Sequence, residues 1–291
     1  MIARLPAVEP PLTAPSSADP ARTGRDGALR LAFERRGDAT VLAACRSMLP
    51  LQVLAPVALE GPAAVVSLLN PTGGVLGGDR LAVDVAIGAG AHACLTTPSA
   101  TRIYRTTGAP AVQSVRLALA RDAIAEWVPA HTIPSAEAAV RQTMDVEVGA
   151  GATLFAVDAW AAGRVARGEA WRFRRLDSAL TVRDGGGLLL HDRLVLGGGT
   201  DWTALGLAEG RPYFATIVVV ADAGLDALLA EVAAATPIAG TLLAAARLPR
   251  RAALVRCLAG SAPALTSALT ALWALARRRL LGLPPLDLRT G

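Results

Sequence analysis

Hydrophobic and polar residues alternate in short runs from about residue 28 to residue 220, and this period of two predicts β-strands rather than helices. Turn residues, mainly Gly, Pro and Asp, separate the runs. The expected strands are Leu29–Arg35, Thr40–Cys45, Ala63–Leu69, Leu81–Ile87, His92–Thr97, Ser114–Leu119, Ala125–Val128, Met144–Val148, Thr153–Asp158, Trp171–Leu176, Ala179–Arg183, Leu188–Leu196 and Phe214–Val220. This part of the chain is therefore predicted to be mainly β.

A weak internal repeat runs through the same region. Four segments share the order strand, short turn, strand, and their first strands end near Ile87, Leu119, Val148 and Val182. These four anchor residues are separated by 32, 29 and 34 residues. A period of about 30 is typical of a solenoid, in which each unit buries its apolar face on the next. We expect a β-helix-like stack with inward-facing anchors in successive layers; the alternative is a run of ordinary hairpins.

The two ends of the chain differ from this middle part. Residues 1–26 are rich in Pro, Ala, Ser and Thr without periodicity, which predicts a disordered leader. Residues 27–291 are expected to form a single domain, β-rich over 28–220 and mixed α/β over 221–291. In the latter, helical spacing predicts helices over Gly224–Ala235 and Ala262–Leu281, with strands Thr241–Ala246 and Ala253–Leu258 between them.

The composition excludes several classes of function. The net charge of +5 comes from Arg without any Lys, but no aromatic-interleaved basic run indicates nucleic-acid binding. Every apolar stretch is broken before the roughly 20 residues that a membrane span needs. Cys45, Cys94 and Cys257 form no CxxC pair, which disfavours a zinc site or disulfide scaffold and fits the cytoplasm. The mean hydropathy of +0.42 instead indicates apolar surface that a partner covers.

Motifs for an independent catalytic site are weak. Gly88-x-Gly90 and Gly149-x-Gly151 superficially match a dinucleotide fingerprint, but a strand-like segment follows each instead of the required helix. The sequence contains no P-loop and no GxSxG, and its three histidines are isolated from one another. We therefore do not expect an enzyme.

The most specific local feature is the glycine element, Asn70-Pro-Thr-Gly-Gly-Val-Leu-Gly-Gly-Asp79. Gly reaches backbone angles with positive φ at little cost, so Gly73-Gly74 and Gly77-Gly78 predict two tight reversals. Asp79 stands at the exit of the turn. Its carboxylate is expected either to face a cavity or to cap a backbone N–H.

A second element, Thr96-Thr-Pro-Ser-Ala-Thr-Arg-Ile-Tyr-Arg105, follows at short distance and contains Arg102, Tyr104 and Arg105. Together the two elements resemble those of the urease accessory protein family UreD, also called UreH. Further matches are Ala125-Glu-Trp-Val-Pro129, the Asp158 region ending in Gly163-Arg164, and Leu188-Leu-Leu-His-Asp-Arg193. The resemblance covers residues 28–287. The chain departs from the family pattern after Pro129, where it continues Ala-His-Thr-Ile-Pro-Ser-Ala.

The resemblance implies a non-catalytic maturation chaperone that joins apo-urease to UreF-like and UreG-like accessory proteins, the latter a GTPase. It implies nickel(II) in transit and no permanently bound cofactor. Acids matching Asp79, Asp158 and Asp192 are implicated in nickel delivery in that family. The positions expected to serve as motif or partner contacts are Gly73, Gly74, Gly77, Gly78, Arg102, Tyr104, Arg105, Glu126 and Trp127.

The repeat adds an argument of its own for two of the acids. Asp158 and Asp192 each lie ten residues after an anchor, so stacking would place them along one shared path. Nickel(II) accepts O and N ligands, and single carboxylates with water would hold it weakly enough to pass on. The alternative is that Arg164 and Arg193 pair with these acids in buried ion pairs that only hold the fold. Two other functions remain open: an assembly scaffold unrelated to nickel, and a hydrolase that uses cleft carboxylates.

Overall fold

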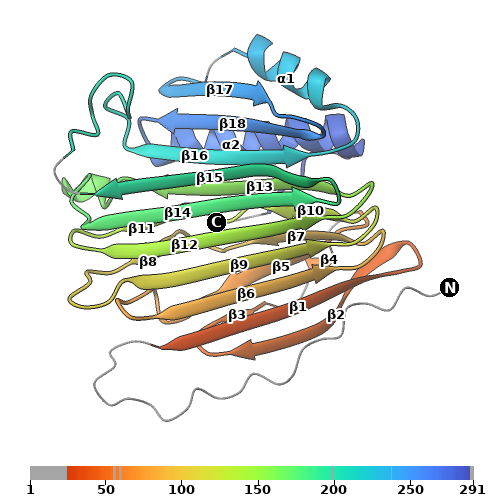
Figure 1. Cartoon of the computed structure of the whole chain (residues 1–291), viewed down its shortest axis with the longest axis horizontal. Helices are drawn as coiled ribbons and strands as arrows, with labels where there is room; N and C mark the ends of the chain where they lie inside the picture. The colour runs from red at the N-terminus through yellow and green to blue at the C-terminus, as the bar shows by residue number, and fades with distance from the viewer. Residues whose placement is uncertain (1–24, 55–56, 59–60, 198–199, 237, 289–291) are drawn as a thin grey trace.

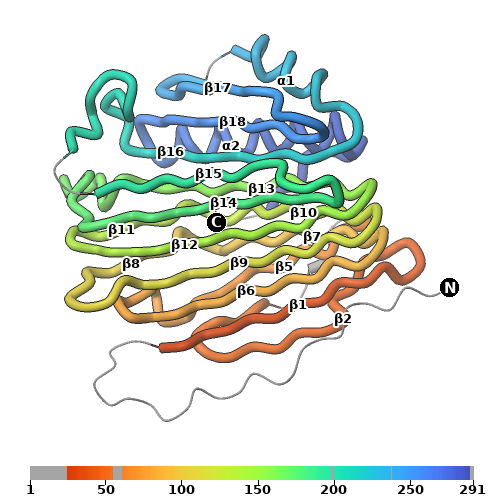
Figure 2. The backbone as a smooth tube through the Cα atoms, in the orientation of Figure 1, coloured from red at the N-terminus to blue at the C-terminus, as the bar shows by residue number. Residues whose placement is uncertain are grey.

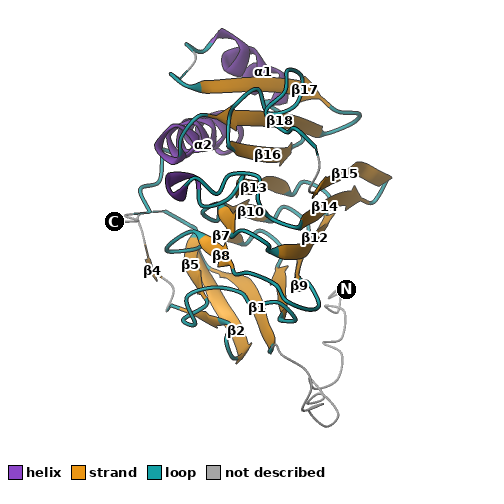
Figure 3. Ribbon diagram, turned by 90° about the vertical axis from the view of Figure 1, so that its left-hand side faces the viewer, coloured by secondary structure: helices purple, strands orange, loops and turns teal. Residues whose placement is uncertain are grey.

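The protein is built in three layers, two β-sheets and a layer of helices (Figures 1 and 3). The computed structural model describes residues 25–54, 57–58, 61–197, 200–236 and 238–288. The mainly-β, solenoid-like prediction is confirmed. None of the described helices is long and apolar enough to cross a membrane.

The first sheet has seven strands in the order β15-β14-β12-β9-β6-β1-β2. Their bounds are β1 Asp26–Arg36, β2 Ala39–Met48, β6 Arg80–Ile87, β9 Ala111–Leu119, β12 Ala139–Val148, β14 Arg175–Asp184 and β15 Gly187–Gly197. The central strands β1, β6, β9, β12 and β14 pair in parallel, and β2 and β15 are antiparallel at the two edges.

The second sheet has eleven strands, in the order β17-β18-β16-β13-β10-β7-β5-β3 with β4, β8 and β11 off this path. Their bounds are β3 Gln52–Val53, β4 Val57–Ala58, β5 Ala64–Leu69, β7 His92–Thr96, β8 Thr101–Ile103, β10 Ile124–Trp127, β11 Thr132–Pro134, β13 Thr153–Ala161, β16 Tyr213–Val220, β17 Thr241–Arg247 and β18 Ala252–Ala259. Strands β5, β7, β10 and β13 pair in parallel, so the chain passes repeatedly from one sheet to the other.

Three of the predicted repeat units form successive coils of the solenoid (Figure 2). Each contributes one strand to each sheet: β6 with β7, β9 with β10, and β12 with β13. Ile87 pairs with Leu119 and Leu119 with Val148, so these anchors stand in one row across the first sheet. All three are buried, which confirms the solenoid prediction for this part of the chain.

The fourth unit corrects the prediction. Its first strand, β14, stacks on β12, but Val182 pairs with Val146, two residues from the expected partner Val148. The next strand, β15, then turns back antiparallel to β14 within the first sheet. The two-residue turn at Gly185-Gly186 is followed by Gly187, whose φ of 105° favours glycine, so the hairpin alternative holds here.

The C-terminal region forms the third layer. Helix α1 spans Leu225–Ala234, and α2 spans Ala262–Ala276 and continues as the single π-turn η2, Arg277–Leu281. The Ser261 side chain caps α2 by accepting a hydrogen bond from the Ala264 N–H. The apolar face of α2 packs on the outer face of β13, β16 and β18, so one core lies between the sheets and a second under the helices.

Other local predictions differ from the structure. The strand expected over Trp171–Leu176 is wrong: Trp171 has a φ of 63°, and β14 begins only at Arg175. The aromatic residues there instead pack together, with the Trp171 ring 6.1 Å from that of Phe214. The short strands β3, β4, β8 and β11 were not predicted. The expected leader lies outside the described residues up to residue 24, while β1 already begins at Asp26.

Candidate functional site

The glycine element packs directly on the Tyr–Arg element. Val75 forms a parallel bridge with Ile103; its N–H donates to the Arg102 carbonyl and its carbonyl accepts from the Tyr104 N–H, each over 2.8 Å. A Cβ added to Gly74 would lie 2.6 Å from the Tyr104 ring and 2.8 Å from the Arg102 carbonyl oxygen. Gly74 is therefore required for this close approach.

The two predicted reversals are present, with φ angles of 81° at Gly73 and 84° at Gly78. A Cβ on Gly77 would lie 2.7 Å from Thr106, so that glycine also serves close packing. Asp79 is buried, and its two carboxylate oxygens accept the backbone N–H groups of Leu76 and Arg25, each over 2.8 Å. The predicted capping role is confirmed. Through it the glycine element is tied to the residue that precedes β1.

These two elements line one end of a cavity of about 270 Å³ between the sheets. Pro98 and Ser99 of the second element are exposed at this end. Further in, the lining contains Trp127, the Pro129-Ala130 turn and Asp158. The segment in which the chain departs from the family pattern therefore begins in the wall of this cavity.

Asp158 is half-buried in the cavity wall, on the face of β13 that points between the sheets. It accepts hydrogen bonds from Gln142 Nε2 and Ser178 Oγ, both over 2.8 Å. Strands β10 and β11 pair with β13 on either side of Asp158, so the turn between them lies opposite the carboxylate. Burial raises the pKa of Asp158, against the opposing effect of its hydrogen-bond donors, and the charge of Asp192 raises it further.

Asp192 projects into the same inter-sheet space from β15, because it pairs across the strands with the buried Leu180. Its carboxylate is 2.6 Å from Arg256 Nη2, and Nη1 of the same guanidinium contacts Thr216 Oγ1. Thr216 in turn pairs with Asp158 across β16 and β13. The two acids thus share one polar region, but they face it from opposite sheets, Asp192 from β15 and Asp158 from β13. The stacking of Asp192 on Asp158 that the repeat predicted is therefore wrong, because β15 turns back within the first sheet.

The alternative to a nickel path was that Arg164 and Arg193 form ion pairs with Asp158 and Asp192. Both arginines pair with other acids instead. Arg164 pairs with Glu169 on the surface, and Arg193 pairs with Asp177. Asp192 is in an ion pair, but with Arg256 from β18, far away in sequence. The contacts of Asp158 described above are hydrogen bonds from neutral side chains.

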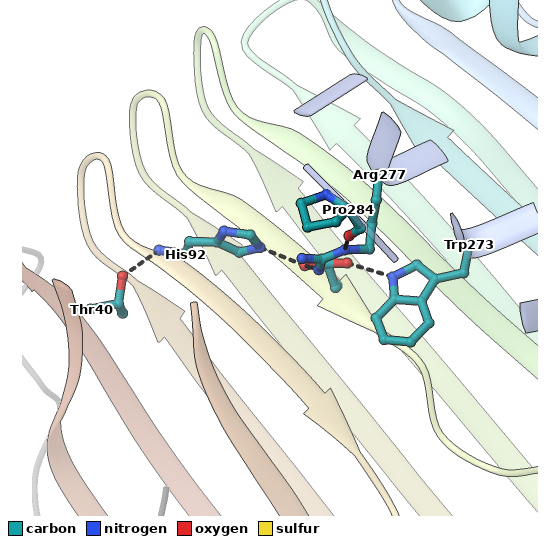
Figure 4. A network of polar contacts seen from close by, with 6 residues as sticks. Thr40, His92, Trp273, Arg277 and Pro284 are labelled. Carbon is teal, nitrogen blue, oxygen red and sulfur yellow. Dashed lines mark hydrogen bonds and ion pairs between the residues drawn. The ribbon is translucent and has the colours of Figure 1, made fainter. Parts of the chain in front are cut away.

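Glu126 occupies a second buried polar site, on the opposite face of the second sheet, which we call the Glu126 cluster (Figure 4). Its carboxylate is 2.5 Å from His92 Nε2 and also accepts hydrogen bonds from the Trp273 indole and the Arg277 guanidinium. Arg277 Nε donates to the Pro284 carbonyl over 2.8 Å, and the His92 N–H donates to Thr40 Oγ1 over 2.8 Å. The cluster therefore joins β2, β7 and β10 to the C-terminal helix and the segment after it.

The cluster sets the ionisation of Glu126. Burial by itself would raise the pKa, but the hydrogen bonds and charges of His92 and Arg277 outweigh it and hold the pKa of Glu126 below its ordinary value. Since side chains alternate along β10, the next residue, Trp127, faces the inter-sheet cavity instead.

Two of the residues expected to contact a partner, Arg102 and Arg105, are exposed and are therefore available for surface contacts.

Sequence reasoning missed three polar residues near Asp158. Gln113, Gln142 and Ser178 pair across β9, β12 and β14 and form one row on the inner face of the first sheet, which we call the Gln113 row. The only signal in the sequence was that each of these strands has one polar residue among the apolar side chains that face inward. Among the described residues, no group of three His, Cys, Asp or Glu side chains is arranged to hold a metal ion. The oxygen ligands in the cavity are thus amides, hydroxyls and one carboxylate.

Comparison with known proteins supports the family resemblance that the glycine and Tyr–Arg elements indicated. The family model described as "UreD urease accessory protein" matches residues 25–291. The chain belongs to the UreD family. It is 39% identical over 223 residues to the urease accessory protein UreD of Delftia acidovorans, a match that covers 75% of this chain and 72% of that protein.

Two further relatives with the same name match over more of the UreD-family chain. The protein of Pseudomonas fluorescens Pf-5 is 37% identical, over 87% of this chain and 90% of the relative. The protein of Alkalilimnicola ehrlichii is 36% identical, over 94% of this chain and 92% of the relative. The resemblance read from the glycine and Tyr–Arg elements therefore extends across the whole UreD domain.

The Glu126 cluster leads to a stability prediction. Replacing Glu126 with Ala strands the buried Arg277 charge and should lower the free energy of unfolding by about 3–5 kcal/mol. Glu126→Gln, which keeps some hydrogen bonds, should cost less. Thermal unfolding and soluble yield measure this, with Glu147→Gln on an exposed position as the control. Equal stability of Glu126→Ala and the control would contradict the role of the cluster.

Asp158 should behave in the opposite way. Its folded pKa is raised above the ordinary 3.8, so the folded chain favours the protonated acid and ionisation at neutral pH costs stability. Asp158→Asn removes that cost and should leave the melting temperature at pH 7 unchanged or higher. Below pH 3.8 the difference should vanish, because the acid is then neutral in both states. A clear loss of stability at pH 7 would show that the charge is structurally required.

Proposed function

We propose that this protein is a non-catalytic urease maturation chaperone that binds apo-urease together with UreF-like and UreG-like accessory proteins and helps nickel(II) reach the urease active site. Membership of the UreD family supports a role in urease maturation. The nickel step rests on one observation: Asp158 is a half-buried carboxylate in the wall of the inter-sheet cavity, held by neutral donors.

A carboxylate in this setting suits brief cation binding. Burying an acid is unfavourable unless it is paired, hydrogen-bonded or neutral, and the pKa of Asp158 is raised accordingly. An arriving divalent cation would supply the missing positive charge. Because only one carboxylate is at hand there, the cation would be held weakly and could leave again.

The Asp192–Arg256 pair would act at the far end of this polar region. A cation that reaches Asp192 must compete with the Arg256 guanidinium, which already contacts both Asp192 and Thr216. The Arg256 side chain is 43% exposed, so it can swing out without burying a bare charge. Asp79 would contribute indirectly, by holding the glycine element in place at the other end of the cavity.

The activation test uses conservative variants. Asp158→Asn and Asp192→Asn keep shape and hydrogen-bonding capacity but lose the charge that attracts a cation. After co-expression with the urease subunits and the other accessory proteins, both should lower urease activity per assembled complex, Asp158→Asn by about tenfold, which corresponds to 1.4 kcal/mol. Asp145→Asn, on an exposed position of β12, is the control. Normal activity with both variants, at normal soluble yield, would exclude the proposed nickel role.

The surface leads to a prediction about association. Several leucines are exposed, Leu205 at 91%, together with Leu188, Leu207 and Leu242, and such apolar surface favours a bound partner. The chain alone should be poorly soluble and become soluble when co-expressed with a UreF-like protein. Soluble yield and pull-down measure this. A monodisperse monomer that ignores that partner would contradict the scaffold role.

A further inference from the structure

Among the described residues, the side chain of Gln113 is unusual because it lines the inter-sheet cavity while its buried amide oxygen has no hydrogen-bond partner. Unsatisfied buried acceptors are rare in folded proteins because their desolvation is not compensated. A half-turn of the amide exchanges its O and N positions, so either end can face the cavity. Gln113 can therefore present a neutral oxygen ligand to the cavity, next to Gln142 on the adjacent strand, which contacts Asp158.

The in-register pairing extends this observation. Gln113, Gln142 and Ser178 occupy equivalent positions on three adjacent parallel strands, spaced by about 4.8 Å per strand. The neighbour of Gln113 on the other side, Leu81 of β6, is apolar. Gln142 and Ser178 already donate hydrogen bonds to Asp158, so the row leads from an unpaired amide oxygen to this half-buried carboxylate.

Size and chemistry agree on the class of ligand. At about 30 Å³ per water molecule, the cavity has room for about nine waters, enough for a divalent cation that keeps most of its hydration shell. Neutral carbonyl and hydroxyl oxygens bind such a cation without trapping it. An apolar ligand would leave the Gln113 amide oxygen unpaired, and an anion would be repelled by ionised Asp158.

We propose that the Gln113 row is a binding site for a partly hydrated divalent cation, in which the Gln113 amide oxygen is the first protein ligand and passes the ion through Gln142 to Asp158. This inference rests on the proposed nickel function and names the ligands that precede the carboxylate. Gln113 and Gln142 act as neutral ligands, and Ser178 holds the Asp158 carboxylate toward the row.

The test compares two leucine variants on one strand. Gln113→Leu removes the oxygen, whereas Val115→Leu changes the same cavity wall, two residues along β9, and removes none. In the co-expressed complex, Gln113→Leu should lower urease activity per complex by about fivefold, as expected for losing one neutral contact. Val115→Leu should change it by less than about twofold. Normal activity for Gln113→Leu, or an equal loss for Val115→Leu, overturns the proposal.

A second measurement does not depend on activity or on how well Gln113→Leu folds. Gln113→Glu places a second carboxylate beside the row and should convert weak binding into retention. After incubation with Ni²⁺ and gel filtration, the Gln113→Glu complex should keep more nickel than the parent, by elemental analysis, and Asp158→Asn in the same background should reverse this. Equal nickel content in Gln113→Glu and the parent overturns the proposal.

Asp158→Asn alone separates this proposal from the proposed function. If Asp158→Asn loses activation while Gln113→Leu does not, nickel delivery stands and the role of Gln113 fails. If both variants activate urease normally, both proposals fail.

Discussion

In-register parallel stacking of the coils is the constraint on which the rest of this structure depends. Once β6, β9 and β12 pair with their anchors in register and β14 pairs in parallel beside β12, paired residues must form rows across the first sheet. Apolar rows such as Ile87, Leu119 and Val148 supply the core. The same pairing places an inward polar residue beside the residues at the paired positions of the neighbouring strands. Gln113, Gln142 and Ser178 lie side by side for this reason, and the last two contact Asp158.

Alternation along the strands of the second sheet separates two polar environments. Glu126 faces the helices and Trp127 the cavity, so one short motif contributes to both sides of the sheet. The protein surrounds the buried Glu126 and the half-buried Asp158 with different kinds of groups. Glu126 is surrounded by charged and polar donors and is held ionised, which binds α2 and η2 to the solenoid. Asp158 has only neutral donors and a raised pKa, so its charge is not compensated by the described protein groups around it.

The sequence allowed much of this fold to be predicted, because period-two patterning and a repeat of about 30 residues are local signals that stacking preserves. It failed where a non-local contact decides. The fourth repeat unit reads like the others, yet its Gly-Gly turn sends β15 back along β14. Asp192 pairs with Arg256, and Glu126 pairs with Arg277. Proximity in the sequence had suggested Arg193 as the partner of Asp192 and no partner for Glu126. The Gln113 row was missed because a lone Gln carries no motif; only register reveals its neighbours.

The electrostatic contrast along the polar region gives it a direction. At the Gln113 end the side chains of the row are neutral, and the cationic side chain in the cavity lining, Arg102, belongs to the exposed Tyr–Arg element. At the other end Arg256 bridges Thr216 and Asp192 and opposes any cation that moves on. An ion would therefore collect at Asp158 until Arg256 releases Asp192. Arg256 lies on β18, between β16 and the edge strand β17, and its partly exposed side chain can swing out to release Asp192.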